Sequence, residues 1–234
     1  MTERILTSSG TPLAVAGQPD SPYALLVLQE AFGVNDHIRA VTDYYATQGF
    51  YAVAPELFHR VGSPEVAYDD FPAAMEALAT LSAAGLHDDL EAAATFCQQS
   101  GYTTASIGVV GFCMGGAVAL YTATVGLVGA ASTFYGGGVE HGRFGLPPLL
   151  ELAPQLRCPW LGLYGDLDKG IPVEQVEALR LATATALPHT ELVRYADADH
   201  GFNCTERPTV YNEAAARNAT ERTLAFFATT LQTR

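Results

Sequence analysis

The segment Ser106-Ile-Gly-Val-Val-Gly-Phe-Cys-Met-Gly-Gly116 decides the fold predicted for this chain. Its first five residues form a short, almost wholly apolar run, which is typical of a strand buried on both faces of a sheet. A helix-like stretch begins at Met114. Between strand and helix, Gly111-x-Cys113-x-Gly115 matches the G-x-S-x-G turn with cysteine in place of serine. The pattern therefore predicts a sharp strand-to-helix turn that presents the thiol of Cys113.

The surroundings of Cys113 favour a nucleophile over a structural cysteine. A lone cysteine is usually a small buried hydrophobe. Glycine makes up 22 of 234 residues, so two flanking glycines arise by chance at roughly 1% per cysteine, against an average glycine content of about 7%. A helix N-terminus below the thiol would favour its thiolate form and stabilise an oxyanion. We predict that Cys113 is the nucleophile and that the remaining cysteines are structural, namely Cys97, Cys158 and Cys204.

Short apolar runs alternate with helical stretches along the chain. The predicted strands cover residues 23–28, 51–54, 106–110, 128–134, 160–164 and 191–196. The predicted helices cover residues 36–47, 72–81, 87–98, 114–124, 172–184 and 212–231. Residues 5–8 and 13–16 flank a Gly-Thr-Pro turn and predict an antiparallel hairpin. The alternation predicts a three-layer α/β sandwich with a mostly parallel sheet.

Composition limits the size of the protein and its partners. With 49% hydrophobic and 16% charged residues, residues 1–234 suit one domain with a full core. The net charge of −13 disfavours nucleic acid and anionic membrane surfaces, which require clustered Lys and Arg. A small anionic substrate remains compatible, because salt screens a distant acidic surface. We expect a small-molecule partner and a monomer or weak homo-oligomer.

Neither a signal peptide nor a membrane span is recognisable in the sequence. The four cysteines form no C-x-x-C pair, and no metal-ligand spacing is visible. Gly136-Gly-Gly138 lacks the features of a phosphate-binding loop and is interpreted as a loop over the active site. We expect a cytoplasmic protein with free thiols that uses neither a metal nor a cofactor.

His200 is the favoured base. It follows the predicted strand at 191–196 and precedes the last helix, so the chain order is nucleophile, acid, histidine. His59, which follows another predicted strand, is the rival. Asp166 and Asp168 both follow the strand that ends at Tyr164, and either carboxylate could orient the histidine and stabilise its cation.

Four motifs together resemble the dienelactone hydrolase family, and the resemblance covers essentially the whole chain. They are Gln29-Glu-Ala-Phe-Gly-Val-Asn35, Gly111-Phe-Cys-Met-Gly-Gly116, Gly165-Asp-Leu-Asp-Lys-Gly-Ile-Pro172 and Asp199-His-Gly-Phe202. That family has an α/β-hydrolase fold and a Cys-His-Asp triad, and it cleaves lactone esters without a cofactor.

The resemblance implies roles for several residues. It favours Asp168 over Asp166 as the acid, because of the spacing to Ile171-Pro172. It assigns the oxyanion hole to the backbone N–H groups of Met114 and Ala31, and it places Glu30 against the resting thiol. A carboxylate there would disfavour a thiolate by like-charge repulsion. The thiol would then be protected from oxidation until substrate rearranges the site.

The arginines depart from the pattern of the resembled family, whose members grip the carboxylate of their namesake substrate with two arginines. Residues 63–86 contain no arginine, and the position four residues after His200 is Cys204. Arg207 and Arg60 are the remaining candidates for substrate binding, together with Tyr135 at the end of a predicted strand.

We predict a hydrolase that opens a lactone or small carboxylic ester through a cysteinyl thioester. A thioesterase or another small-ester hydrolase is the alternative within enzymes. A non-catalytic ligand-binding protein on the same fold is the alternative outside them.

Overall fold

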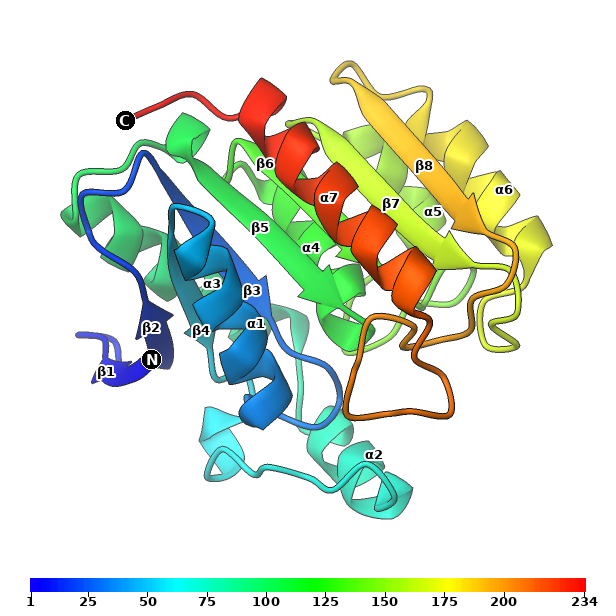
Figure 1. The fold of residues 1–234 in the computed structure, drawn as a ribbon, viewed down its shortest axis with the longest axis horizontal. Coiled ribbons are helices and arrows are strands. Elements are labelled where there is room, and N and C mark those ends of the chain that lie inside the picture. Colours follow the sequence, from blue (N-terminus) through cyan, green and yellow to red (C-terminus); the bar gives the residue numbers. More distant parts are fainter.

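The eight strands form one sheet in the order β1-β2-β4-β3-β5-β6-β7-β8 (Figure 1), in a computed structural model that describes residues 1–234. Strands β3 to β8 run parallel, whereas β1 and β2 pair antiparallel and β2 joins the sheet antiparallel to β4. The strands are β1 (Glu3–Leu6), β2 (Pro12–Ala16), β3 (Tyr23–Leu28), β4 (Phe50–Pro55), β5 (Ile107–Phe112), β6 (Ala130–Phe134), β7 (Trp160–Gly165) and β8 (Thr190–Tyr195). The predicted mostly parallel sheet with an N-terminal antiparallel hairpin is confirmed.

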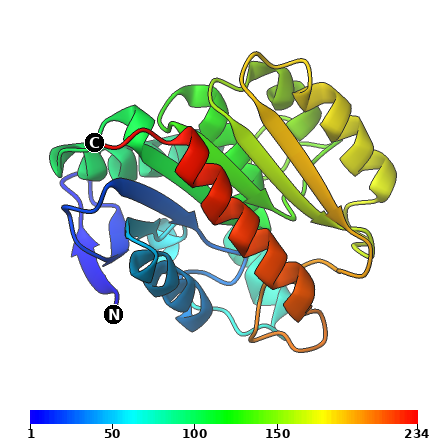
Figure 2. The same ribbon diagram turned by 45° about the horizontal axis from the view of Figure 1, so that its top comes forward.

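Helices cover both faces of the sheet. Helices α1 and α7 lie side by side on one face, and α3, α4, α5 and α6 cover the other (Figures 1 and 2). The helices are α1 (Asp36–Thr47), α2 (Phe71–Ala79), α3 (Ala83–Gln99), α4 (Met114–Val125), α5 (Leu149–Leu152), α6 (Val173–Thr183) and α7 (Glu213–Thr230), with short 3-10 turns at His59–Val61, Thr104–Ser106 and Ala153–Gln155. This arrangement confirms the predicted three-layer α/β sandwich.

Alternate side chains of the central strands enter different cores. Along β3, Leu26 and Leu28 belong to a cluster of 38 buried residues on the α3–α4 side. Leu25 and Val27 belong to a cluster of 23 buried residues on the α1–α7 side. Successive side chains of a strand point to opposite faces, so a strand between two helical layers must be apolar throughout. This requirement explains the unbroken apolar runs in the sequence.

The start of α3 differs from its predicted position. The helix begins at Ala83 rather than at His87, because the side chain of Ser82 accepts a hydrogen bond from the Gly85 N–H at 3.1 Å. Such a cap satisfies a backbone donor that a helix leaves unpaired in its first turn. Asn35 caps α1 in the same way. The four-residue helix α5 was not predicted, because one helical turn carries no periodicity.

The sheet order places a topological switch point at the carboxyl ends of β3 and β5. Strand β3 lies between β4 and β5, so the chain turns in opposite directions after β3 and after β5. Ligand sites in open α/β sheets occur at such a switch point. Leu28 of β3 pairs with Gly111 of β5, so Glu30 and Cys113 each follow this pair by two residues. The register therefore brings Glu30 and Cys113 to the same edge of the sheet.

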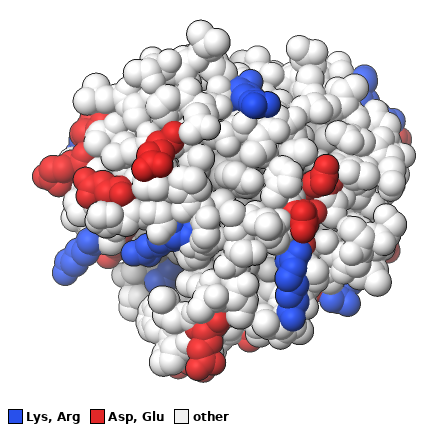
Figure 3. Space-filling view, turned by 180° about the vertical axis from the view of Figure 1, so that it is seen from behind, with Lys and Arg blue, Asp and Glu red and all other residues white.

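Charged side chains are dispersed over the surface. On the face opposite to that of Figure 1, Lys and Arg side chains stand singly or beside acidic ones (Figure 3). Six arginines form ion pairs, namely Arg4, Arg39, Arg60, Arg180, Arg194 and Arg222. None of the helices is both long and apolar enough to span a bilayer.

Candidate active site

Cys113 lies in a strained turn between β5 and α4. Its backbone has φ 55° and ψ −114°, which a side chain other than glycine rarely adopts. Such a conformation costs on the order of 1–3 kcal/mol and persists only where the surroundings enforce it. Here the Cys113 N–H donates to the Phe134 carbonyl at 3.0 Å, and the Gly115 N–H donates to the Gln29 carbonyl at 3.1 Å. These two hydrogen bonds hold the turn against the end of β6 and the residue that follows β3.

The two flanking glycines are required by close backbone contacts. A Cβ atom at Gly111 would collide with the Gly115 carbonyl, and one at Gly115 would lie 2.5 Å from the Gln29 carbonyl oxygen. Both obstacles are backbone atoms, which cannot move aside without distorting the turn. The G-x-C-x-G pattern therefore has a steric origin in this fold.

The Cys113 side chain faces a small cavity of about 90 Å³ at the edge of the sheet. The lining includes Cys113, His200, Arg143, Phe144 and Ile171. Larger cavities of about 410, 400 and 260 Å³ lie elsewhere and contain neither Cys113 nor His200. Of these cavities, only the one at Cys113 brings a thiol and an imidazole to a common space.

His200 lies between Cys113 and Asp168. Its Nδ1 is 2.6 Å from Asp168 Oδ2, and the other oxygen of Asp168 accepts from the Gly170 N–H at 2.8 Å. Burial by itself lowers the pKa of His200, but the negative charge of Cys113 and the hydrogen bond to Asp168 raise this pKa well above its ordinary value. The interactions with Cys113 and Asp168 thus both favour the imidazolium form of His200.

The structure separates the two candidate acids. Asp166 is held by Arg194, whose Nε and Nη2 donate to its two carboxylate oxygens at 2.7 Å each. Asp168 is only 4% exposed and faces His200. Because a bidentate arginine occupies Asp166, Asp168 is the carboxylate available to orient the histidine.

Glu30 lies at the same edge and is almost fully buried. Burial raises its pKa, while the positive charges of Arg207 and His200 and a hydrogen bond from Tyr135 act against the rise. The Tyr135 hydroxyl donates to Glu30 Oε1 at 3.3 Å, and the rings of Tyr135 and His200 lie 5.1 Å apart. Tyr135 itself has a positive φ of 41°. Tyr135 thus connects Glu30 with the catalytic histidine candidate, although it does not line the cavity at Cys113.

Two backbone amides near Cys113 have no acceptor within the protein. The N–H groups of Ala31 and Met114 form no hydrogen bond, although both residues are buried. The bond from Gly115 to Gln29 holds their two segments together. Unpaired buried donors are uncommon, and converging amides beside a nucleophile can stabilise a developing oxyanion.

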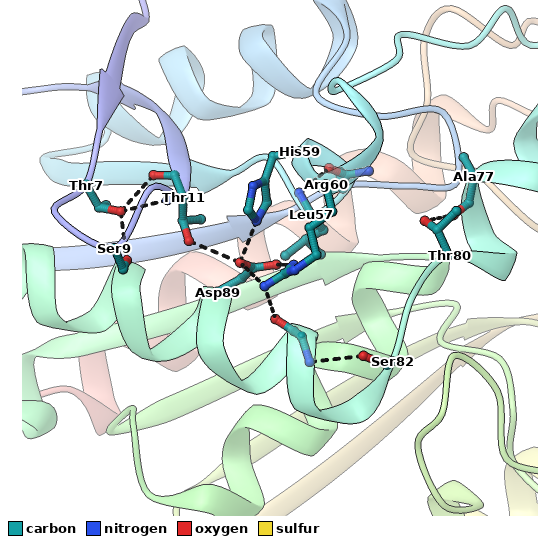
Figure 4. Close-up of polar contacts among 12 residues, drawn as sticks. Thr7, Ser9, Thr11, Leu57, His59, Arg60, Ala77, Thr80, Ser82 and Asp89 are labelled. Atoms are coloured by element: carbon teal, nitrogen blue, oxygen red, sulfur yellow. Dashed lines mark hydrogen bonds and ion pairs between the residues drawn. The ribbon is translucent and has the colours of Figure 1, made fainter.

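Arg60 lies away from the cavity at Cys113. Its Nη1 donates to Asp89 Oδ2 at 2.6 Å, and the buried Asp89 also accepts from Thr11 at 3.1 Å and contacts His59 Nε2 at 2.9 Å (Figure 4). His59 and Arg60 line the cavity of about 400 Å³. The arginine and the rival histidine thus both belong to a network that compensates a buried carboxylate.

Arg207 is half-buried beside a contacting pair of aromatic rings, whose centroids lie 4.6 Å apart. Its guanidinium carbon lies 5.7 Å from the ring centroid of Phe32 and 5.9 Å from that of Tyr68, within the range of cation–π contacts. A Cβ atom at Gly201 would lie 2.5 Å from Arg207 Nη1, so this glycine gives the arginine its space. The charge of Arg207 acts on Glu30, but Arg207 does not line the cavity at Cys113.

Arg143 is the arginine that does line this cavity, and sequence reasoning missed it. It is exposed, lies in the loop between β6 and α5, and has no carboxylate within 4.0 Å. The loop carries no periodic pattern that would locate its side chains. The one available signal was its start at Tyr135-Gly-Gly-Gly138, which was interpreted as a loop over the active site.

The sheet order and the strained strand-to-helix turn at Cys113 define a protein of the α/β-hydrolase class. The sequence model of the dienelactone hydrolase family matches residues 13–231. The chain therefore belongs to the dienelactone hydrolase family.

Individual relatives agree with this assignment. A Salmonella typhimurium protein with the name "Putative carboxymethylenebutenolidase" is 37% identical over 207 residues, which are 87% of this chain and 76% of the relative. A Pseudomonas putida protein with the name "Carboxymethylenebutenolidase" is 31% identical over 222 residues, which are 92% of this chain and 90% of the relative. A solved Klebsiella pneumoniae structure, titled "Putative Dienelactone Hydrolase", has a TM-score of 0.86 and 32% identity, and the match covers 97% of this chain and 98% of that one.

Proposed function

We propose that this protein hydrolyses a lactone or a small carboxylic ester through a thioester on Cys113. The carrying observation is that His200, held by Asp168 at 2.6 Å, faces the same cavity as Cys113. A nucleophile, a base in contact range and a third group that orients the base are the parts that covalent acyl transfer needs. The names of the relatives from Pseudomonas putida and Salmonella typhimurium support a lactone as substrate.

In the first half-reaction, Cys113 Sγ bonds to the carbonyl carbon, and the carbonyl oxygen becomes an oxyanion. The free N–H groups of Ala31 and Met114 donate to that oxygen. The ester C–O bond then breaks, and the leaving oxygen takes the proton of the His200 imidazolium. In a lactone this oxygen stays attached to the acyl group as a hydroxyl, so the ring opens.

In the second half-reaction, neutral His200 takes a proton from water while the water oxygen bonds to the thioester carbon. The C–S bond breaks, and the sulfur leaves as a thiolate beside the imidazolium. Asp168 accepts the hydrogen bond from Nδ1 of His200 and stabilises the cation in both halves. The carboxylic acid product is released, and the resting pair is restored.

Glu30 is proposed as the group that positions the resting sulfur. The register of β3 and β5 supports this place, because Glu30 and Cys113 follow the paired residues Leu28 and Gly111 by the same distance along the chain. Burial raises the pKa of Glu30, which limits the like-charge repulsion that an ionised carboxylate would exert on the thiolate. Glu30 thereby adjusts how much of Cys113 is charged before substrate arrives.

We propose Arg143 as the residue that binds a carboxylate on the substrate. It lines the cavity with Cys113 and is not engaged by an acidic side chain. Arg60 is held by Asp89, and Arg207 packs beside the rings of Phe32 and Tyr68. Of the arginines considered, Arg143 therefore has the most direct access to a ligand at Cys113.

The test is to trap the acyl-enzyme. A small aryl ester is mixed with the protein, and the phenol released in the first turnover is followed by rapid mixing. We expect a burst of about one phenol per chain and a mass increase on the peptide that contains Cys113. Ring opening is measured separately with a panel of small lactones by acid release at constant pH. A wild-type protein that shows neither a burst nor acylation of Cys113 would refute the proposal.

The same experiments distinguish the alternatives. A thioesterase would acylate Cys113 but turn over acyl thioesters far faster than lactones of matched acyl size. A non-catalytic binding protein would bind a lactone without opening it and would show no burst.

A further inference from the structure

A second cluster of chemically reactive side chains lies beside the active site. Glu30, His37 and Cys204 each offer one ligand atom, and these three atoms lie within 4.8 Å of one another. The three residues are 1%, 5% and 0% exposed. They come from the segment after β3, the first turn of α1 and the β8–α7 connection. Hydrolysis as proposed uses neither His37 nor Cys204.

Two of these residues carry a buried side-chain atom without any hydrogen-bond partner, namely Glu30 Oε2 and His37 Nε2. Buried polar atoms are rarely left unpaired, because they lose hydrogen bonds to water and gain none in return. Glu30 Oε1, by contrast, accepts from Tyr135. A ligand that contacts both unpaired atoms would supply the missing partners.

The third ligand atom is oriented by its surroundings. Cys204 Sγ lies 3.4 Å from the Tyr68 hydroxyl, which accepts a further hydrogen bond from the Asn35 side chain at 3.1 Å. Asn35 is also the N-cap of α1, the helix whose first turn contains His37. The same residue thus connects the position of the imidazole with that of the thiol. In metal sites, hydrogen bonds of this kind typically orient the side chains that bind the metal.

A carboxylate, an imidazole and a thiol are the donor types of zinc sites. Zn²⁺ accepts oxygen, nitrogen and sulfur ligands, whereas Mg²⁺ and Ca²⁺ prefer oxygen alone. We propose that Glu30 Oε2, His37 Nε2 and Cys204 Sγ bind a zinc ion, with the fourth position open to water.

The three ligand atoms can coordinate this ion if the distances between them shorten slightly. Ligand distances of about 2.0–2.3 Å in a tetrahedral site place neighbouring ligand atoms about 3.3–3.8 Å apart. Since the three atoms already lie within 4.8 Å of one another, the longest distance between two of them has to shorten by at most about 1–1.5 Å. Side-chain rotations of this size occur without a change in backbone fold.

The protonation states of His37 and Cys204 affect how each could bind a metal ion. Burial lowers the pKa of His37 to about 4, so its ring is neutral near pH 7 and offers a lone pair. Burial and the charge of Glu30 raise the pKa of Cys204 to about 11. A metal ion must therefore displace the thiol proton when it binds.

A cavity on the α1–α7 side borders one of the three residues. His37 lines the cavity of about 410 Å³ between these helices, together with Tyr44 of α1, Asn203 and Arg217 of α7. Tyr44 is exposed, so the cavity opens at the surface beside His37. Glu30, Cys204 and Cys113 do not line it. The sequence did not reveal the site, because no metal-ligand spacing connects residues 30, 37 and 204.

The test uses Co²⁺ as a spectroscopic substitute for zinc in the full-length, chelator-treated protein. We expect one Co²⁺ per chain, with absorption from thiolate-to-cobalt charge transfer and the visible bands of a tetrahedral ion, both removed by Zn²⁺. The bands should persist in Cys113→Ala and in the matched control Cys158→Ala. They should vanish in Cys204→Ala, and His37→Ala should weaken binding by more than about 100-fold, beyond the usual loss on altering an outer contact.

Several outcomes would overturn the proposal. Wild-type protein without the charge-transfer band would do so, as would a band that survives in Cys204→Ala. Loss of the band in Cys113→Ala with retention in Cys204→Ala would place the ion on Cys113 and His200 instead. Because Cys204→Ala could fold poorly, Cys204→Ser serves as a second variant, checked by circular dichroism. Zinc should raise the melting temperature of wild type but not that of Cys204→Ser.

The consequence for hydrolysis rests on the proposed role of Glu30. Zinc would occupy the carboxylate that positions the resting sulfur, so zinc loading should lower turnover in wild type and leave the turnover of Cys204→Ala unaffected. Unchanged wild-type turnover together with the cobalt bands would refute the role of Glu30 and leave the metal site standing. Absent bands would refute the metal site and leave the hydrolase proposal standing.

Discussion

The imidazole Nδ1 of His200 lies 2.6 Å from Oδ2 of Asp168, although the two residues are 32 positions apart in the chain. The contact arises because β7 and β8 are adjacent parallel strands, whose pairing ends with Gly165 opposite Tyr195. Asp168 and His200 follow that pair on neighbouring connections. A carboxylate in this position sets which ring nitrogen of the histidine carries the proton, and it stabilises the imidazolium.

Replacing Asp168 by Asn should lower turnover by on the order of 10³–10⁴-fold, by analogy with other triads. Asp166→Asn is the matched control, because it lies two residues away and interacts with Arg194. The control should keep most of its turnover and lose only part of an ion pair near the surface. Turnover of the Asp168→Asn and Asp166→Asn variants is measured from steady-state rates with the same aryl ester. Equal losses, or a larger loss at Asp166, would contradict the assignment of Asp168.

Cys113→Ala should abolish hydrolysis and leave the fold intact, because no other thiol lines the cavity. Cys113→Ser should retain weak turnover, since the same turn supports serine nucleophiles. Cys158→Ala controls for the loss of a buried thiol away from the cavity and should keep wild-type rates. Circular dichroism verifies folding. Turnover by Cys113→Ala above a trace would show that the nucleophile lies elsewhere.

The titration of His200 should depend on Cys113. In wild type, the negative charge of Cys113 contributes to a pKa of His200 well above its ordinary value. Cys113→Ala removes this charge while burial and Asp168 remain, so the pKa of His200 should fall and the ring should deprotonate at lower pH. NMR titration of the histidine ring protons measures the pKa of His200 in wild type and in Cys113→Ala. An unchanged His200 pKa would mean that Cys113 carries no charge in the resting protein.

Gly115→Ala should destabilise the fold. The added Cβ would lie 2.5 Å from the Gln29 carbonyl oxygen, and overpacking of this kind costs about 1–3 kcal/mol or more. In a chain of this length the melting temperature should fall by roughly 2–4 °C per kcal/mol. Gly137→Ala is the control, because its Cβ would meet only Ile171 at 3.9 Å. Equal melting temperatures for the two variants would disprove the steric account of the motif.

Arg143→Met should raise KM for lactones that carry a carboxylate by about 10–100-fold, the equivalent of one charge-assisted hydrogen bond. KM for a neutral aryl ester should change little, because no charge is contacted. Arg207→Met, measured on the same two substrates, tests the other candidate. If the selective increase occurs in Arg207→Met and not in Arg143→Met, then Arg207 binds the carboxylate.

Local patterns predicted the elements well but missed some of their ends. The unbroken apolar runs of β3 and β5 are explained by helices on both faces of the sheet. The Ser82 cap that begins α3 at Ala83 joins residues only three positions apart, so a local pattern can identify it. Helix α5 gave no such signal, because four residues complete only one turn.

By itself, the sequence determined the strand–helix alternation, the N-terminal hairpin and the G-x-C-x-G turn, because each depends on neighbours within a few residues. Only the tertiary structure decided which carboxylate meets His200, since Arg194, 28 residues from Asp166, occupies the other one. It likewise placed Arg143 at Cys113 and brought Glu30, His37 and Cys204 together. These contacts depend on strand order and on aperiodic loops, which join residues far apart in the chain and leave no regular pattern in the sequence.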